Sequence, residues 1–420
     1  MASHTLNAVR SLRSDHHLTL LKGSAAFFPA LTGAIAAARF EVRLETYMFH
    51  FDHSARTIAE ALESAAARGV AVYVVVDGVG TGELPAEWQR RWAAAGVHWR
   101  IFNPAEGWRL LTPKRWRRLH RKLCVVDGAV AFCGGINLLD DLFDPNHGTL
   151  DGPRFDFTVQ VQGPLVTDVL DTMQRLWARL QVTREAARLD LGGAVDALRA
   201  AASAGTDMAD DAMMKTGDRL EPDRVRGSMA TLVLRDNVRF RRAIEGAYRL
   251  AIARAKSEIL IANAYFIPGV RLQRSLLRAA QRGVKITLLL QGRYEYFMPY
   301  HASRAVYGPL LAAGVEIIEY EASFLHAKVA VMDSDNGALA TVGSSNLDPL
   351  SLLLAREANL LIRDDVFAAE LRGHLLDAIA HHGRRVDPSE HRRRTFMPRA
   401  MAWGAYAAMR LALFLTGKRY

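Results

Sequence analysis

The sequence predicts an α/β protein made of two tandem-duplicated domains, each a mixed β-sheet flanked by helices. Two observations support this fold class. Apolar strand-like segments alternate with helix-like segments along both halves of the chain. Segments of the first half also return in the second: Ala-Ala-Arg-Gly-Val ending at Val70 is echoed by Ala-Gln-Arg-Gly-Val ending at Val284, an offset of 284 − 70 = 214 residues. An internal duplication explains both observations.

The first half alternates in a regular order. The helices are expected over 27–39, 55–68 and 85–95, where Ala-rich or amphipathic patterns occur. Gly69 and Gly96 follow the last two, in the position that often ends a helix. The strands are expected at 18–21, 41–49, 70–76, 97–102, 123–126 and 129–133. The second half repeats this order and closes with a helix over 366–381.

These patterns divide the chain into four parts. The first domain is expected at 1–188, a linker rich in Ala, Asp, Gly and Met at 189–228 with a possible helix at 195–204, the second domain at 229–385, and a tail at 386–420. The tail has a basic cluster at 391–394 and then an apolar stretch that contains Trp403. It is interpreted as an amphipathic helix at a membrane surface, or alternatively as a helix docked on the protein's own core.

Composition limits the class of partner. The 420 residues carry 54 Lys and Arg against 44 Asp and Glu, a net charge of +10 that favours an anionic partner, either nucleic acid or a membrane surface. Cys124 and Cys133, the two cysteines, are expected to be buried, reduced thiols. The N-terminus has no apolar signal region and no apolar run is long enough to span a membrane. A location on the cytoplasmic side is therefore expected.

One motif occurs twice. The pattern His-x-Lys-x4-Asp is found at His120–Asp127 and again at His326–Asp333. Each copy is followed by a Gly-containing turn that ends in an asparagine, Asn137 in the first half and Asn346 in the second. One short motif is weak support for a function, but two copies with matching turns are not explained by chance. Isolated histidines such as His50 are interpreted as surface or core residues.

The residue types in the motif suit phosphodiester chemistry. Residues two apart on a strand project to one face, so His120 and Lys122 share a small volume, as do His326 and Lys328. Two such sets facing each other would supply a nucleophile, an acid and cations for the phosphate oxygens, without a metal or another cofactor. The motif aspartates, Asp127 and Asp333, belong to the catalytic motif, although their strand-to-turn positions favour bonding to local backbone.

The paired motifs resemble those of the phospholipase D superfamily, and the wider pattern is similar to the bacterial cardiolipin synthases of the B type. The similarity includes Glu45-Thr-Tyr47, Ala262-Asn-Ala-Tyr-Phe-Ile-Pro268 and Gly343-Ser-Ser-Asn-Leu-Asp-Pro349. It implies two phospholipase D-like domains with the active site at their interface. It also implies that one motif histidine forms a phosphohistidine; we expect His120 to be this nucleophile and His326 to be the general acid and base.

The resemblance extends to supporting residues. Acidic residues that hold the histidines are expected at Glu357 in the second half and Asp156 in the first. Gly135 stands where the second half has Ser344, so the site is not symmetric, and Ala355 departs from the polar residue expected there. The positions that match the phosphate-binding set are Lys122, Lys328, Asn137, Asn346 and Ser344.

The function implied is that of a cardiolipin synthase, which transfers a phosphatidyl group from one phosphatidylglycerol to another and releases glycerol. The partners expected are phosphatidylglycerol and an anionic membrane surface, not nucleic acid, with peripheral binding to the cytoplasmic face of the inner membrane through the tail and the basic stretch 105–119. Two alternatives remain: a phospholipase D or nuclease with water as acceptor, and a binding protein with a relict site. The oligomeric state and the acceptor alcohol stay open.

Overall fold

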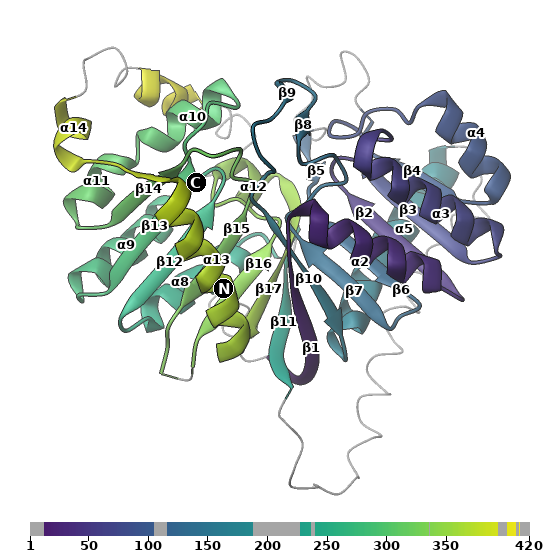
Figure 1. The fold of residues 1–420 in the computed structure, drawn as a ribbon, viewed down its shortest axis with the longest axis horizontal. Helices are drawn as coiled ribbons and strands as arrows, with labels where there is room; N and C mark the ends of the chain where they lie inside the picture. The colour runs from purple at the N-terminus through teal and green to yellow at the C-terminus, as the bar shows by residue number, and fades with distance from the viewer. Residues whose placement is uncertain are drawn as a thin grey trace, which may run out of the picture.

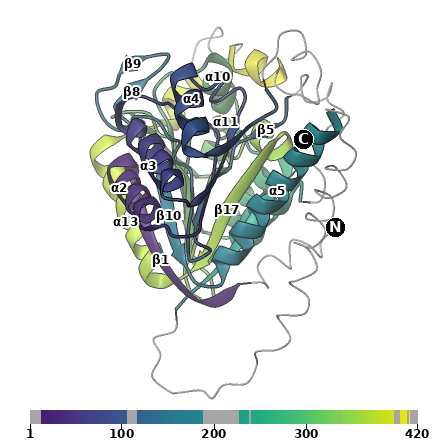
Figure 2. The same cartoon turned by 90° about the vertical axis from the view of Figure 1, so that its right-hand side faces the viewer.

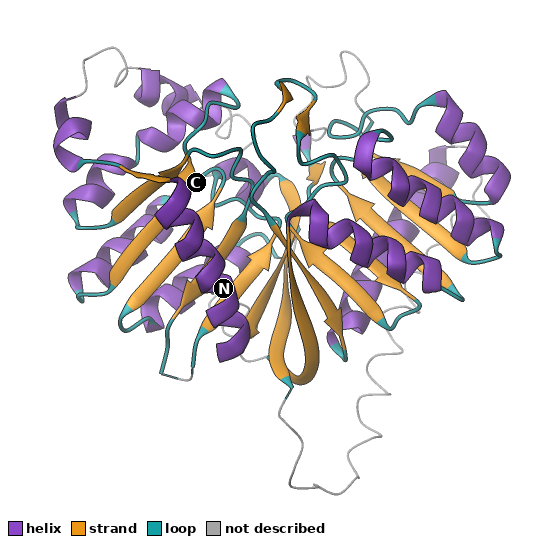
Figure 3. Cartoon of the chain, in the orientation of Figure 1, coloured by secondary structure: helices purple, strands orange, loops and turns teal. Residues whose placement is uncertain are grey.

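The computed structural model describes residues 12–104, 116–187, 227–236, 240–335, 337–393, 401–408 and 411. Figure 1 shows two halves of similar design side by side, with the strands converging toward the middle of the molecule. Figure 3 shows strands in the centre of each half and helices outside them. This arrangement confirms the predicted α/β class with mixed sheets.

The first half contains the following elements in chain order: β1 (Arg13–Lys22), α2 (Gly23–Ala37), β2 (Glu41–Thr46), the short 3-10 helix η1 (His53–Ala55), α3 (Arg56–Ala67), β3 (Ala71–Asp77), α4 (Ala86–Ala95), β4 (His98–Phe102), β5 (Arg118–Leu119), β6 (Lys122–Val126), β7 (Val130–Gly134), β8 (Phe143–Asp144), β9 (Gly148–Thr149), β10 (Phe157–Gln162) and α5 (Leu165–Ala187).

The second half repeats the design: β11 (Ser228–Arg235), α8 (Ala243–Arg254), β12 (Glu258–Asn263), α9 (Val270–Gln281), β13 (Lys285–Gln291), α10 (Phe297–Arg304), α11 (Tyr307–Ala312), β14 (Glu316–Tyr320), β15 (Lys328–Met332), β16 (Leu339–Gly343), α12 (Pro349–Leu353), β17 (Ala355–Arg363), α13 (Asp365–His382), β18 (Gly383–Arg385) and α14 (Pro388–Arg393). Asp364 caps α13 by accepting hydrogen bonds from the backbone N–H groups of Val366 and Phe367.

The two halves form one continuous sheet, which the sequence did not predict. Its strand order is β18-β14-β13-β12-β15-β16-β17-β11-β1-β10-β7-β6-β2-β3-β4, with β5 paired to β17. The halves join where β1 runs antiparallel to both β10 and β11. Within each half, the parallel strands β2-β3-β4 and β12-β13-β14 lie outside, and the antiparallel motif strands lie nearer the centre. Both motifs are thereby brought toward the centre of the molecule.

Helices cover both faces of the sheet. In Figure 2, α5 lies on the opposite side of the sheet from α2 and α13. Helix α5 contacts β6, β7 and β10 of its own half and also β11 of the other half, and α13 likewise contacts β14, β15 and β16 together with β1. Each of these two helices therefore packs on its own half and also on the strand of the other half that lies at the centre of the sheet.

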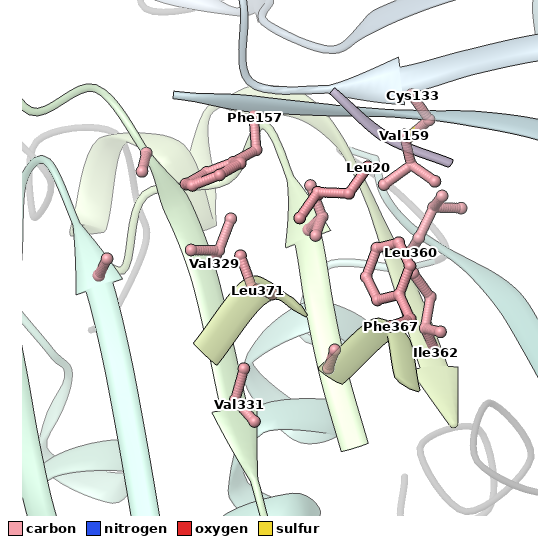
Figure 4. Packing of buried hydrophobic residues seen from close by; sticks show 14 of the residues in the cluster. Leu20, Cys133, Phe157, Val159, Val329, Val331, Leu360, Ile362, Phe367 and Leu371 are labelled. Carbon is pink, nitrogen blue, oxygen red and sulfur yellow. The ribbon is translucent and has the colours of Figure 1, made fainter. Parts of the chain in front are cut away.

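A shared hydrophobic core fixes the halves relative to one another. One cluster of buried residues draws members from both of them, and each half has a further cluster under its outer helices. Burial of this continuous apolar surface favours one fixed arrangement of the halves. Figure 4 shows the labelled members of the shared cluster packing together across the interface: Leu20, Cys133, Phe157 and Val159 from the first half and Val329, Val331, Leu360, Ile362, Phe367 and Leu371 from the second.

Most of the predicted elements are present within one to three residues of their predicted ends, and Gly69 and Gly96 do end α3 and α4 with positive φ. Most of the linker predicted at 189–228, including the possible helix at 195–204, lies outside the described residues. In the tail, residues 401–408 are helical and pack through Ala405 and Tyr406 against Ile267 and Ala302. No helix in the described part of the chain is long and apolar enough to cross a membrane.

Candidate active site

Each motif histidine lies just before a buried strand and is hydrogen-bonded through its backbone to the other half. The N–H of His120, before β6, donates to the carbonyl of Arg356 at 3.0 Å. The N–H of His326, before β15, donates to the carbonyl of Phe155 at 2.9 Å. Beside them, β5 pairs in parallel with β17, and Phe155 forms a parallel bridge with Leu325. These bonds hold both histidines at the interface between the halves.

The histidines are paired with carboxylates that come from the opposite half. His120 Nδ1 lies 3.0 Å from Glu357 Oε1 and 3.1 Å from Oε2. His326 Nδ1 lies 2.6 Å from Asp156 Oδ2. A carboxylate at Nδ1 fixes the ring orientation and leaves Nε2 for chemistry. The acidic residues expected from the resemblance are present, and their pairing crosses between domains, so one half alone does not form either pair.

The electrostatics of the two pairs differ. Burial lowers the pKa of His120, while the negative charge of Glu357 acts in the opposite direction. Burial lowers the pKa of His326 well below its usual value, and the charge of Lys328 adds to this. Burial also raises the pKa of the partner, Asp156, to about 7. In the second pair burial thus shifts the pKa of the imidazole and that of the carboxyl group toward one another, whereas in the first the charge of Glu357 opposes the effect of burial on its imidazole.

The motif lysines are buried cations beside the histidines. Lys122 is 5 % exposed, and its Nζ donates to the carbonyl of His120 at 2.7 Å. Lys328 has no exposed surface, and its Nζ donates to the carbonyl of His326 and lies 3.9 Å from Asp156 Oδ2. Burial lowers the pKa of both ammonium groups, that of Lys122 to about 7. An anion bound between them would stabilise their charged forms.

The asparagines after the motifs have matched orientations. Asn137 Oδ1 accepts a hydrogen bond from the backbone N–H of Met48 at 3.3 Å, and Asn346 Oδ1 accepts one from the N–H of Tyr265 at 3.3 Å. Because each amide oxygen is used in this way, each NH2 group is the part that can donate to a phosphate oxygen. Both asparagines line the central pocket, as the phosphate-binding positions of the resemblance require.

Gly135 and Ser344 differ for a steric reason. A Cβ added at Gly135 would meet Asp156 Oδ1 at 2.4 Å, so the Asp156 carboxylate fills the space of that side chain. Ser344 has no exposed surface, and its Oγ donates to Glu357 Oε2 at 2.5 Å. Because its hydroxyl proton is donated to the partner of His120, we propose that Ser344 supports the site indirectly and does not bind phosphate.

The motif aspartates lie beyond the far ends of β6 and β15 from the histidines. The carboxylate of Asp127 accepts hydrogen bonds of 2.8 Å from the backbone N–H groups of residues 39–41, which begin β2. That of Asp333 accepts bonds from the N–H groups of residues 256–258, which begin β12. Neither carboxylate lines the pocket. We therefore assign them no contact with substrate and propose that they anchor the neighbouring strands, in place of the catalytic role given by motif membership.

A cavity of about 680 Å³ opens over the two histidines and takes residues from both halves. This volume is in the range of pockets that bind small molecules. Its lining combines polar groups of the motifs with apolar side chains. The polar lining includes His120, Asn137, Asp156, His326 and Asn346, and the apolar lining includes Met48, Val79, Ile136, Leu139, Ile267, Leu354 and Ala355.

Several lining residues were not predicted as site residues. The ring of Tyr47 lies 4.9 Å from that of His120 and 5.4 Å from Lys122 Nζ, measured to its centroid. Tyr47 belongs to the segment Glu45–Tyr47 that carries the resemblance, so the sequence did contain a signal for it. His50, interpreted as a surface or core residue, also lines the pocket. Tyr265 likewise belongs to Ala262–Pro268, another segment of the resemblance, whereas Arg154 and Glu295 had no signal in the sequence, because only the fold brings them to the cavity.

The end of the basic stretch 105–119 lies beside this pocket. Its residues 105–115 are outside the described part of the chain, but Trp116 and Arg118 line the cavity. The Arg118 guanidinium lies 3.2 Å from the Asp77 carboxylate, which also accepts the N–H of Leu119 at 2.7 Å. The end of the stretch is thus anchored next to the site.

Comparison with known proteins supports the same family throughout. A family model described as "Cardiolipin synthase, PLD-like domain" matches residues 31–150 and 248–378, one match in each half. The chain belongs to the cardiolipin synthase family of phospholipase D-like proteins. It is 36 % identical over 387 residues to cardiolipin synthase B of Salmonella typhi, covering 91 % of this chain and 85 % of that protein. It is 35 % identical over 389 residues to cardiolipin synthase B of Escherichia coli K12, covering 92 % and 86 %. The predicted resemblance is confirmed.

Solved structures agree on the fold. The phosphatidylserine synthase of Haemophilus influenzae aligns over 99 % of both chains with a TM-score of 0.65 at 12 % identity. A polyphosphate kinase from Porphyromonas gingivalis aligns over 89 % of this chain and 49 % of that protein, with a TM-score of 0.53 at 17 % identity. At these identities the likeness concerns the fold alone. The two matches of the family model, one in each half, confirm the prediction of two phospholipase D-like units in one chain.

Proposed function

We propose that this protein is a cardiolipin synthase that transfers a phosphatidyl group from one phosphatidylglycerol to another and releases glycerol. The observation that carries the proposal is the pair of histidines that line one cavity, each held by a carboxylate of the opposite half and each followed by a buried lysine. Membership of the cardiolipin synthase family supports the choice of a phospholipid substrate.

In the first step, His120 Nε2 attacks the phosphorus of the donor lipid and a phosphorus–nitrogen bond forms. The bond to the glycerol headgroup oxygen breaks, and that oxygen takes a proton from His326. Lys122, Lys328 and the two asparagine amides stabilise charge on the non-bridging oxygens of the transition state. Glycerol leaves, and the phosphatidyl group stays on His120 as a phosphohistidine.

In the second step, a hydroxyl of the acceptor glycerol headgroup attacks phosphorus and gives its proton to His326. The phosphorus–nitrogen bond breaks, His120 returns to its free form, and cardiolipin leaves. The two steps consume no further reactant, because the proton that His326 loses in the first step is returned to it in the second.

The electrostatics support this division of roles between the histidines. A phosphohistidine carries positive charge on its ring, which the negative charge beside His120 stabilises. The other pair suits proton transfer, since the pKa of Asp156 is raised to about 7 beside His326. The assignment of His120 as nucleophile and His326 as acid and base is thus proposed on charge as well as resemblance.

Apolar side chains around the pocket favour a lipid over a nucleic acid. Tyr296 and Val79 line the cavity and are 41 % and 47 % exposed, and Phe297 and Met298 follow at the start of α10. Figure 1 shows α10, the β8–β9 hairpin and α4 on the same edge of the molecule. Aromatic and apolar groups of this kind suit a bilayer interface, whereas a nucleic acid would require cations.

The tail adds to this surface. Its helix at 401–408 docks on the protein through Ala402 and Ala405, while Trp403 is 58 % exposed. The two interpretations from the sequence are thus compatible, because one face contacts the core and another is available to lipid. We propose that the protein binds peripherally to an anionic membrane through this edge, and we retain the cytoplasmic face of the inner membrane as a prediction.

The test is to incubate the purified protein with phosphatidylglycerol in mixed micelles and to identify the products. We expect cardiolipin and free glycerol in equal amounts. Phosphatidic acid as the sole lipid product would replace the proposal with a phospholipase D, and cleavage of single-stranded DNA at a comparable rate would replace it with a nuclease. Lipid analysis of cells that express the protein extends the test to alternative acceptors.

A further inference from the structure

A hydrogen-bonded tyrosine–glutamate pair stands in the wall of the pocket and has no part in the steps described above. Tyr265 Oη donates to Glu295 Oε2 at 2.5 Å. Both side chains line the cavity, and both are partly exposed. Within the described residues, this is the one hydrogen bond that the structure gives the Glu295 side chain, so its second oxygen can accept another.

The pair lies close to the reacting groups. The residue before Tyr265 is bonded to the residue after His326, since the N–H of Ala264 donates to the carbonyl of Ala327 at 3.0 Å. The N–H of Tyr265 itself binds Asn346 Oδ1. The charge of Lys328 also acts on Glu295, where burial raises the pKa of the carboxyl group. Tyr265 and Glu295 therefore border the His326 side of the cavity.

The first half has no such pair at the corresponding place. Met48 is the counterpart of Tyr265, because its N–H binds Asn137 just as that of Tyr265 binds Asn346. Met48 carries no polar group, and other apolar residues of the first half that line the cavity are Val79, Ile136 and Leu139. The two halves therefore differ at this position, with a methionine in the first and a hydrogen-bonded tyrosine in the second.

The chemistry of the pair selects its ligand. A phosphate would be repelled by the carboxylate, and an acyl chain would leave Glu295 Oε1 unsatisfied. Because the one hydroxyl proton of Tyr265 is already donated to Glu295, a neutral ligand hydroxyl can donate to Glu295 Oε1 or to a lone pair of Tyr265 Oη. Two adjacent hydroxyls, as in a glycerol headgroup, can donate to both residues at once.

We propose that Tyr265 and Glu295 form a polyol subsite that binds the glycerol headgroup of the acceptor and holds its attacking hydroxyl beside His326. The subsite rests on the proposed function, because it acts on the phosphohistidine intermediate. By microscopic reversibility the leaving glycerol occupies the same place. Recognition by hydroxyl groups would favour glycerol over a simple alcohol and over water.

The test measures formation of the phosphohistidine separately from its division between competing acceptors. Phosphatidyl-p-nitrophenol in mixed micelles serves as donor, because its leaving group needs neither the acid nor the subsite. Release of p-nitrophenol reports the first step. The partition is then read from the lipid products formed with added glycerol and 1-propanol: phosphatidylglycerol, phosphatidylpropanol and phosphatidic acid.

We expect the wild-type protein to prefer glycerol over 1-propanol. Tyr265→Phe and Glu295→Leu should each lower this preference about tenfold, the loss of one hydrogen bond, while p-nitrophenol release changes less than about threefold. Glu295→Gln keeps an acceptor oxygen and should recover part of the preference. Tyr307→Phe is the matched control, because Tyr307 Oη also bonds a glutamate, Glu319, at 3.3 Å, but both residues are fully buried away from the pocket.

An unchanged preference in Tyr265→Phe and Glu295→Leu would overturn the subsite and leave the proposed function standing. A similar loss in Tyr307→Phe would also overturn it, since the effect would then reflect only packing. If Glu295→Leu does not fold, Tyr265→Phe carries the test alone, as it removes a single hydroxyl. Wild-type protein that releases no p-nitrophenol would instead overturn the proposed function, and the subsite with it.

Discussion

The two halves of the molecule place a histidine and a lysine at the same strand positions but surround them differently. His120 faces Glu357, which is held in place by Ser344. His326 faces Asp156, which fills the space left by Gly135. The duplicated motif thus gives two imidazoles, one beside a fixed negative charge and one beside a carboxyl group whose pKa is about 7.

The difference shows how a symmetric fold can divide one reaction between two similar residues. The fold sets the positions of the histidines, and burial together with nearby charges, Glu357 beside His120 and Lys328 beside His326, shifts their pKa values. Because each carboxylate crosses the interface, the halves depend on one another for chemistry as well as for packing. The following predictions test this comparison, beginning with the largest expected effect.

Replacing either histidine by alanine should lower cardiolipin formation by about 10⁴-fold, because each removes a nucleophile or an acid. The variants should differ with phosphatidyl-p-nitrophenol. His326→Ala should still form a phosphohistidine, since the leaving group needs no acid, whereas His120→Ala should not. The measurement is radiolabelled phosphate retained on the denatured protein. Label on His120→Ala and none on His326→Ala would reverse the roles.

Replacing either carboxylate by its amide should lower the rate of cardiolipin formation by about 100-fold, the usual effect of losing a residue that orients a catalytic histidine. Glu357→Gln should slow formation of the phosphohistidine from the activated donor. Asp156→Asn should leave that step within a few-fold and slow turnover of phosphatidylglycerol, which requires an acid. Stopped-flow release of p-nitrophenol and steady-state cardiolipin formation separate the two. Equal effects of both variants on both measurements would contradict the division of roles.

The buried lysines should make anion binding depend on pH. Because the pKa of Lys122 is lowered to about 7 in the free protein, a bound sulfate must restore its proton at higher pH. The affinity for sulfate should then fall by about tenfold for each pH unit above 7 and level off below it. Isothermal titration calorimetry at pH 6 to 9 measures this. Lys122→Met should remove the slope; if the slope persists, Asp156 is the titrating group.

Exchanging Ser344 and Gly135, the residues next to the two carboxylates, should have the smallest effect on activity. Ser344→Gly makes the second half resemble the first and should lower turnover by a few-fold, since Glu357 loses one hydrogen bond. Gly135→Ser should lower turnover further and reduce the melting temperature by a few degrees, because its Cβ would displace Asp156. Assays of both variants beside thermal unfolding measure the two effects. A harmless Gly135→Ser would show that Asp156 can move without loss.

Much of the fold and of the site could be predicted from the sequence, because local patterns carry the information. Alternation of apolar residues predicted strands such as β3, and glycines such as Gly96 marked the ends of helices. The repeated His-x-Lys-x4-Asp motif predicted His120, His326 and their lysines through residue type and spacing alone. The interpretation of Asp127 and Asp333 as backbone anchors also followed from their position after a strand.

Other features depend on residues that are distant in sequence. Glu357 and His120 are 237 positions apart, and no local pattern shows that each carboxylate serves the histidine of the other half. Nor does any show that β1 and β11 join the halves into one sheet. Tyr265 and Glu295 are 30 positions apart and meet only because β12 and the segment after β13 reach the same cavity.

The sequence by itself therefore determined the family, the α/β class and the duplication, and it supplied the residues proposed to react, because these follow from local periodicity and repeated motifs. The tertiary structure alone decided which carboxylate lies beside which histidine, which group occupies the space of a side chain at Gly135, and that Tyr265 and Glu295 meet in the pocket. These features depend on packing across the interface between the halves, where side chains from both copies are buried together and shift one another's pKa values.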